Sequence, residues 1–181
     1  MTMVSNTTAR RGLPWRVIGW GGIAVLLSVP LVLGFPWTFS DYIFAGVLLG
    51  LVGLCLELGF RASSNAAYRT GVGLAVVASF LLLWLNAAVG IIGNEDLDAN
   101  LLFLGVIAVA LGGSFVARFK PEGMARAMVL AAVAEILVPF VAHAFALAPT
   151  EALLRREVPV LTTFFTGVWL LSAWLFHRAA R

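Results

Sequence analysis

The segment Met124–Leu147, MARAMVLAAVAEILVPFVAHAFAL, decides the fold class of this chain. It exceeds the roughly 20 residues that a helix needs to cross the hydrocarbon core of a bilayer. Its ionisable residues are Arg126 near the start, Glu135 near the middle and His143 near the end. The segment therefore predicts a membrane-spanning helix with a carboxyl group close to its midpoint.

The composition of the whole chain agrees with this prediction. Of the 181 residues, 61% are hydrophobic and 12% are charged, and the mean hydropathy is +1.00. Soluble domains have about 25% charged residues, so a soluble globule is excluded. The apolar runs are about twice as long as the roughly ten-residue alternating strands of an outer-membrane barrel. We predict an all-α, polytopic transmembrane bundle that forms a single integral membrane domain.

The hydropathy pattern predicts about six membrane spans joined by short links. No link is long enough for a soluble domain. The predicted spans lie at about 15–35, 41–60, 70–93, 101–119, 124–147 and 158–177.

The distribution of charge predicts the orientation. If the first span begins on the cytoplasmic side of the membrane, ten of the 12 basic residues lie inside. This distribution matches the positive-inside rule. Both termini are then cytoplasmic, and the first span is an uncleaved helix in a bacterial inner membrane. The inside set is Arg10, Arg11, Arg16, Arg61, Arg69, Arg118, Lys120, Arg126, Arg178 and Arg181. The outside set is Arg155 and Arg156 with Asp41, Glu95, Asp96, Asp98, Glu151 and Glu157.

Glu135 is the leading candidate for a functional residue. An acidic residue near the centre of a span is costly to insert, so it is by default a functional hypothesis. Pro139 has no N–H to donate to the Glu135 carbonyl, so we expect a bend and a free carbonyl there. A carboxyl group and a free carbonyl at one level suit a proton or a cation. The alternative is a neutral glutamic acid that holds two helices together.

Several polar residues share a depth in the outer half of the predicted spans. Together they predict an outward-facing polar cavity with Glu135 at its floor. Taken singly, each has a structural alternative, since hydroxyl groups can bond their own helix and Asn or His can bridge helices. The candidate ligand-binding set is Glu135, His143, Asn86, Thr162, Thr163 and Ser28.

The link Gly93–Asn100 is the most polar stretch of the chain. Its carboxylates, Glu95, Asp96 and Asp98, are predicted to form an acidic rim that concentrates cations. The spacing does not match an EF-hand calcium loop. The alternative is a solvated turn in which Asp98 or Asn100 caps the next helix.

Shorter patterns predict local contacts. Glu57 and Arg61 stand four residues apart on one helix face and should form an ion pair. The lone Cys55 lies in an apolar run and is expected to pack there. Glycines at 46, 50 and 53 have the spacing that allows close helix approach, within the chain or in a homodimer. A shift of 57 residues aligns Arg61 with Arg118, which is consistent with a repeat or with hairpins that each need flanking arginines.

These features give three functional hypotheses and no named family. The first is a protein that binds or moves a small ligand, cation or proton through the cavity. The second is a non-catalytic accessory or assembly subunit of a membrane complex. The third, an enzyme with a metal on His143 and outer-loop carboxylates, is disfavoured because clustered ligands and known catalytic motifs are missing. We expect no cofactor and no nucleic-acid partner, and the lipid bilayer as the main surrounding.

Overall fold

The computed structural model describes residues 15–181, except for the side chains of residues 15, 16 and 18. All regular structure in this range is helical, in line with the predicted fold class. Arg10 and Arg11, part of the predicted inside set, lie outside the described residues. The helices are α1 (Trp15–Val32), α2 (Phe39–Ala62), α3 (Ala66–Ala88), the 3-10 turn η1 (Asp98–Leu101), α4 (Leu102–Val116), α5 (Pro121–Ala144), α6 (Thr150–Leu153) and α7 (Glu157–Ala179).

The chain divides into two compact units within α2, Met1–Gly53 and Leu54–Arg181. In the first unit, Trp20 and Ile23 of α1 lie next to Gly53 of α2. A Cβ atom added at Gly53 would stand 3.0 Å from Ile23 Cδ1 and 3.3 Å from Trp20 Cη2, whereas nothing lies within 4 Å of one at Gly50. Of the three predicted glycines, Gly53 thus faces two large side chains of α1, Gly46 has Leu27 Cδ1 at 4.0 Å from the same position, and Gly50 faces open space.

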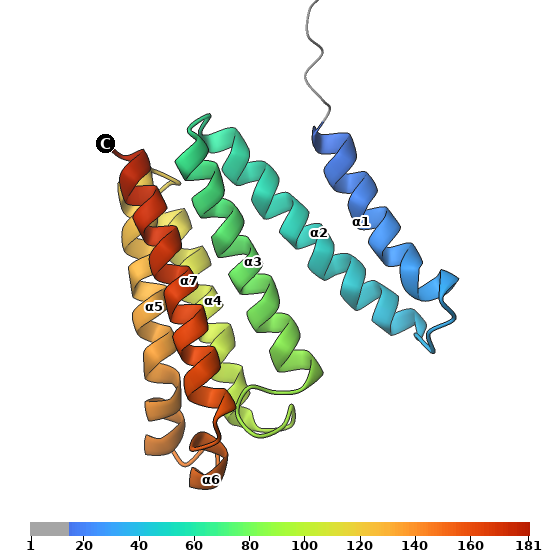
Figure 1. The fold of residues 1–181 in the computed structure, drawn as a ribbon, viewed down its shortest axis with the longest axis vertical. Helices are drawn as coiled ribbons and strands as arrows, with labels where there is room; N and C mark the ends of the chain where they lie inside the picture. The colour runs from blue at the N-terminus through green and yellow to red at the C-terminus, as the bar shows by residue number, and fades with distance from the viewer. Residues whose placement is uncertain (1–14) are drawn as a thin grey trace, which may run out of the picture. The chain divides into compact units, whose positions relative to one another are not determined.

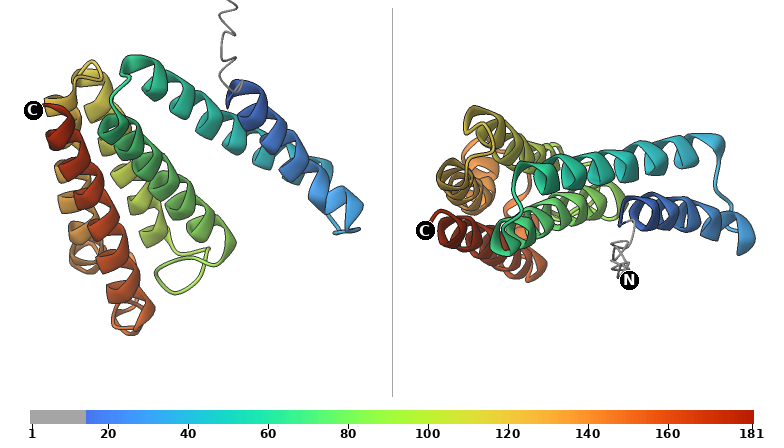
Figure 2. Two further views of the ribbon diagram at one scale, coloured as in Figure 1. Left: turned by 45° about the horizontal axis from the view of Figure 1, so that its top comes forward. Right: turned by 90° about the horizontal axis from the view of Figure 1, so that it is seen from above.

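The second unit contains a four-helix bundle of α3, α4, α5 and α7 (Figures 1 and 2). The helix α7 packs against both α3 and α5, and α4 packs against α5. Because successive helices reverse direction, α7 runs antiparallel to both of its neighbours. The α2–α3 turn, the α4–α5 turn and Arg181 lie at one end of this unit, and α6 lies at the other (Figure 1).

The buried faces of α5 and α7 follow one alternating spacing of four and three residues. This spacing repeats every seven residues and aligns a seam of side chains along each helix. On α5 the seam consists of Met124, Met128, Ala131, Glu135, Val138 and Ala142. On α7 it consists of Val158, Thr162, Phe165, Trp169, Ser172 and Phe176, and all of these except Thr162 are buried.

The contact between α7 and α3 combines a hydrogen bond with aromatic packing. Ser172 Oγ donates to the Gly71 carbonyl oxygen at 2.8 Å. Nearby, the rings of Tyr68 and Phe176 meet edge to face with centroids 5.1 Å apart. Since apolar burial drives helices together only weakly in lipid, such close packing and interhelical hydrogen bonds stabilise the bundle.

Five helical segments are long and apolar enough to cross a membrane. They correspond to the second to sixth predicted spans. Within α1 the described apolar segment, Gly19–Val32, is shorter than the others. The apolar helices indicate a membrane location and contact with lipid.

The helix ends differ from the predicted span ends for local reasons. Helix α3 begins at Ala66, four residues before the predicted start at position 70. It begins there because Asn65 Oδ1 caps the helix by accepting a hydrogen bond from Ala67 N at 2.8 Å. It ends at Ala88 rather than 93, because Gly90 and Gly93 adopt positive φ. Helix α5 begins at Pro121, a residue suited to a first turn. The helix α6 was not predicted.

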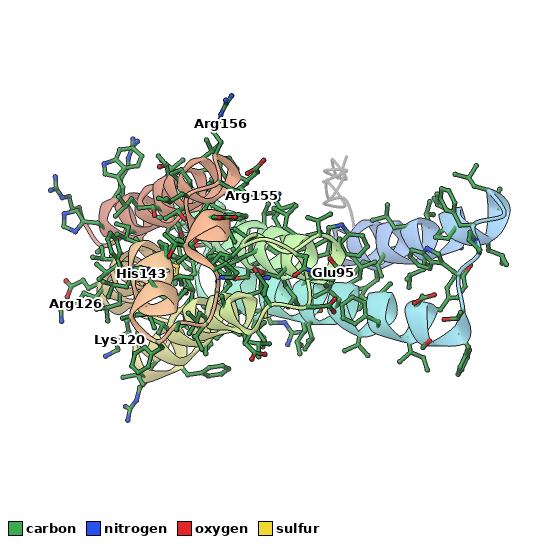
Figure 3. The ribbon with its side chains drawn as sticks, turned by 90° about the horizontal axis from the view of Figure 1, so that it is seen from below. Glu95, Lys120, Arg126, His143, Arg155 and Arg156 are labelled. Carbon is green, nitrogen blue, oxygen red and sulfur yellow. The ribbon has the colours of Figure 1, made fainter. Side chains whose placement is uncertain are left out.

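Charge separates the two ends of the second unit. The basic end, formed by the α2–α3 turn, the α4–α5 turn and the end of α7, carries Arg61, Arg69, Arg118, Lys120, Arg126, Arg178 and Arg181, together with Glu57 and Glu122. The acidic end carries Glu95, Asp96, Asp98, Glu151 and Glu157, together with Arg155 and Arg156, and Arg156 projects away from the bundle in Figure 3.

Candidate functional site

Glu135 lies in the interior of the bundle, on the seam of α5. Its exposed fraction is 0%, and neither carboxyl oxygen has a hydrogen-bond partner within the described part of the chain. Helix α5 continues through Pro139, whose nitrogen carries no hydrogen to donate to the Glu135 carbonyl oxygen. Because buried polar atoms are nearly always paired, the two carboxyl oxygens call for a partner that residues 15–181 do not supply in hydrogen-bonding geometry.

A polar group from another helix, the indole of Trp169 on α7, lies next to Glu135. The indole N–H faces the Glu135 carboxyl group. The two groups do not complete a hydrogen bond of normal geometry, and the Trp169 nitrogen remains unpaired among the described residues. Trp169 is itself 0% exposed, so this donor and the carboxyl group are both buried where α5 packs against α7.

Two threonines continue this set of unpaired groups along α7. Thr162 and Thr166 precede Trp169 by seven and three residues and lie on the same side of the helix. Their hydroxyl oxygens are buried and have no partner within residues 15–181. Other hydroxyl groups in these helices bond the carbonyl four residues earlier, as Ser79 and Ser114 do at 2.9 and 2.7 Å. Thr162 and Thr166 therefore keep both hydrogen-bonding functions available.

Asn86 adds a fifth residue from α3. Its Nδ2 donates to the Leu82 carbonyl at 2.7 Å, while its Oδ1 is buried and unpaired in the described region. Since Gly71 is level with Ser172 and α3 is antiparallel to α7, Asn86 lies near the level at which α7 begins. We call Asn86, Thr162, Thr166, Trp169 and Glu135 the polar column.

The polar column extends from the middle of the bundle toward the acidic end. With a rise of about 1.5 Å per residue, Thr166 and Thr162 lie about 4.5 and 10 Å from the level of Trp169 in that direction. Toward the basic end the next groups are the Ser172–Gly71 hydrogen bond and the Tyr68–Phe176 ring pair. Toward the basic end, the polar column is therefore bordered by one completed hydrogen bond and one pair of aromatic rings.

The remaining predicted ligands lie elsewhere. His143 is exposed at the end of α5, one position beyond buried Ala142, so it does not join Glu135 on the seam. Thr163 is exposed and its hydroxyl donates to the Pro159 carbonyl at 2.7 Å. Ser28 belongs to α1 in the first unit, and its hydroxyl donates to the Ala24 carbonyl at 2.8 Å. For Thr163 and Ser28 the structure gives the alternative role, bonding their own helix.

The acidic link owes its conformation to Asn100. The buried Asn100 side chain accepts from Ile91 N and Ile92 N at 3.0 and 2.9 Å, and it donates to the Ile92 and Asn94 carbonyls at 3.1 and 2.6 Å. These bonds fold the link so that Ile91 and Ile92 are buried in the core cluster. Neither Asp98 nor Asn100 caps the next helix, as the alternative interpretation expected, because Leu97 precedes η1, Leu101 precedes α4, and no side chain caps either one.

The carboxylates of this link are exposed, as a solvated rim requires. Glu95, Asp96 and Asp98 all point away from the buried core of the link. Figure 3 shows Glu95 and His143 well apart at the acidic end. Within residues 15–181 no group of three His, Cys, Asp or Glu side chains is placed to hold a metal ion.

The predicted ion pair between Glu57 and Arg61 is confirmed by a contact between Glu57 Oε1 and Arg61 Nη2. Glu57 is buried, while the Arg61 side chain reaches out at the basic end. Cys55 is half-buried, consistent with packing.

Sequence reasoning did not select Trp169. Its position on the seven-residue seam of α7 is visible in the sequence, as is the spacing from Thr162 and Thr166. What the sequence does not show is which turn of α7 lies opposite Glu135, because that depends on how the α5–α7 connection folds.

Comparison of the chain with protein-family models, with curated proteins and with solved structures finds no match. The fold and the polar column define the class of this protein. It is a helical bundle with apolar, membrane-type helices, and among its described residues several buried polar atoms have no hydrogen-bond partner.

Proposed function

We propose that this protein binds and moves a proton or small cation through the second unit, with Glu135 as its central binding residue. The observation that carries the proposal is that both Glu135 carboxyl oxygens are buried and unpaired beside an unpaired indole N–H. A proton satisfies one carboxyl oxygen directly. A small cation would be bound by the carboxylate, by the carbonyl of the same residue, to which Pro139 cannot donate, and by neighbouring hydroxyl oxygens.

The threonines and Asn86 extend this site into a path. Thr hydroxyls both donate and accept, so they can pass a proton or bind a cation without bearing charge themselves. Their place between Glu135 and the acidic end makes that end the side of entry. The exposed carboxylates Glu95, Asp96 and Asp98 would then raise the local concentration of cations there.

The proposal includes a topology. We place the protein in a bacterial inner membrane with six spans, α1 being the first, and with both termini in the cytoplasm. What supports this is the basic end of the second unit, where seven arginine and lysine residues gather near the α2–α3 turn, the α4–α5 turn and the end of α7. The acidic end then faces outward.

A second candidate function is that of a non-catalytic accessory or assembly subunit. The complete burial of Glu135 favours it, since an enclosed neutral carboxyl group can hold helices together. In this case the polar column serves packing alone, and ions have no effect on the stability of the protein.

Thermal unfolding in detergent separates the two functions. Wild type, Glu135→Gln and the exposed control Glu151→Gln are compared across pH and a panel of monovalent and divalent chlorides. A ligand that binds only the folded state adds about 2.7 kcal/mol at one hundred times its Kd. The proposal predicts that wild type and Glu151→Gln respond to one ion or to pH, whereas Glu135→Gln folds and does not respond.

A matched pair on α7 tests the path. Thr166→Val removes an unpaired hydroxyl, and Thr163→Val removes one that bonds its own helix. Proteoliposomes with an internal pH-sensitive dye report proton entry. Slower flux with Thr166→Val than with Thr163→Val supports the path. Equal flux in these variants, in Glu135→Gln and in empty vesicles would favour the accessory subunit.

A further inference from the structure

A groove of about 990 Å³ lies between α5 and α7 at the basic end, separate from the polar column. Each helix contributes one stripe of residues to it, spaced by three or four positions. From α5 the groove is lined by Glu122, Ala125, Arg126, Val129 and Leu130. From α7 and the residues that follow it, the groove is lined by Leu170, Ala173, Trp174, His177, Ala180 and Arg181.

Small residues create this hollow. Ala125 and Ala173 are buried at its floor, where larger side chains would fill the space between the helices. Val129, Leu130 and Leu170 are exposed and form its walls toward the middle of the bundle. This part of the groove offers apolar contacts only, as a lipid chain requires.

The other part of the groove is basic. Arg126, His177 and Arg181 line it, and the only carboxylate side chain there is that of Glu122. Neither Arg126 nor Glu122 forms an ion pair in the part of the chain that the structure describes. Both Arg126 and Lys120 extend from the edge of the bundle in Figure 3, but Lys120 does not line the groove.

His177 and Arg181 are oriented by one another. Arg181 Nη2 lies 3.1 Å from His177 Nε2. Because a guanidinium group can only donate, Nε2 is the acceptor, and His177 carries its hydrogen on Nδ1 in this arrangement. Trp174, one turn earlier, has the Arg178 guanidinium 5.7 Å from its ring centroid. The groove thus combines cationic donors, an interfacial tryptophan and an apolar floor.

We propose that this groove binds one anionic phospholipid. Its phosphate would accept hydrogen bonds from Arg126, Arg181 and His177 Nδ1, and its acyl chains would lie along Val129, Leu130 and Leu170. Charge complementarity selects an anionic lipid over a zwitterionic one, because basic pockets between helices at a membrane surface bind such head groups. The apolar walls select a lipid over free phosphate. This inference does not depend on the proposed function of Glu135.

Lipid retention measured by native mass spectrometry tests the proposal. Wild type, the double variant Arg126→Gln/Arg181→Gln and the control Lys120→Gln are reconstituted in nanodiscs of equal phosphatidylglycerol and phosphatidylcholine. Each protein is then released into detergent, and its bound lipids are counted. We expect wild type and Lys120→Gln to retain phosphatidylglycerol in preference to phosphatidylcholine. The affinity should fall by about fivefold for each groove arginine removed.

Two further measurements distinguish binding of a whole lipid from binding of its phosphate alone. Leu130→Asn with Leu170→Asn keeps the charges and should also reduce retention, because the acyl chains lose their walls. Excess inorganic phosphate should leave retention unchanged. The proposal is overturned if wild type shows no preference for phosphatidylglycerol, if Lys120→Gln loses as much lipid as the double variant, or if inorganic phosphate displaces the lipid.

Discussion

Ser172 on α7 donates a hydrogen bond of 2.8 Å to the carbonyl oxygen of Gly71 on α3, 101 residues earlier in the chain. Ser172 is fully buried, and the absence of a side chain at Gly71 allows Phe176 to pack there. This contact fixes the height of α7 relative to α3. It therefore determines the levels at which Thr162, Thr166 and Trp169 lie.

Ser172→Ala should lower the free energy of unfolding by about 0.5–1.5 kcal/mol, because one interhelical hydrogen bond is lost. The control is Ser79→Ala, whose hydroxyl bonds its own helix at Ala75. Unfolding by increasing sodium dodecyl sulfate in mixed micelles measures both. A larger loss with Ser79→Ala than with Ser172→Ala would contradict the role given to this bond.

Gly113 and Gly112 on α4 offer adjacent tests of helix packing. A Cβ atom at Gly113 would stand 2.7 Å from Ala127 Cβ on α5, whereas one at Gly112 meets nothing within 4 Å. Gly113→Ala should destabilise the protein by about 1–3 kcal/mol through overpacking. Gly112→Ala should be neutral or stabilising by up to about 1 kcal/mol, since alanine favours a helix. The same titration with sodium dodecyl sulfate measures the free energy of unfolding of both variants. Equal changes in the two variants would contradict the expected difference.

Asn100→Ala should unfold the acidic link locally. The substitution leaves the buried Ile91 and Ile92 amides without acceptors, at about 1–3 kcal/mol for such unpaired groups. Hydrogen exchange followed by mass spectrometry should show faster exchange in residues 90–97. Asn94→Ala is the control, since only the backbone carbonyl of Asn94 contacts Asn100. Unchanged exchange in Asn100→Ala would show that other contacts hold the link.

Tyr68→Phe should loosen the α4–α5 turn. The Tyr68 hydroxyl donates to the Phe119 carbonyl at 2.8 Å, and Phe119 and Arg118 both adopt positive φ there. Losing this bond should cost about 1 kcal/mol and increase cleavage by trypsin at Arg118 or Lys120. Limited proteolysis in detergent provides the readout. Cleavage at the wild-type rate would mean that the turn holds its conformation without Tyr68.

Much of the fold was predictable because it depends on local composition. The apolar runs predicted the helical segments, since a backbone in lipid must satisfy its own hydrogen bonds. The i, i+4 spacing predicted the Glu57–Arg61 pair. The helix ends were less predictable, because the Asn65 cap and the positive φ of Gly90 depend on contacts at single residues.

The candidate site was predicted only in part. Glu135 stood out because a carboxyl group is costly inside a span, and this cost is a property of the residue and its neighbours in sequence. His143 was grouped with it by depth along the helix. Depth does not give the direction of a side chain, and the structure leaves His143 exposed while Glu135 is buried.

The sequence alone thus determined the class of fold, the helical segments and the unusual position of one carboxyl group. These follow from transfer free energies and helix geometry, which act over a few turns. Only the tertiary structure decided that Trp169 faces Glu135 and that Thr162 and Thr166 remain unpaired. Those relationships depend on the relative height and rotation of α3, α5 and α7, which are set by contacts between residues far apart in the sequence, such as the Ser172–Gly71 bond between α7 and α3.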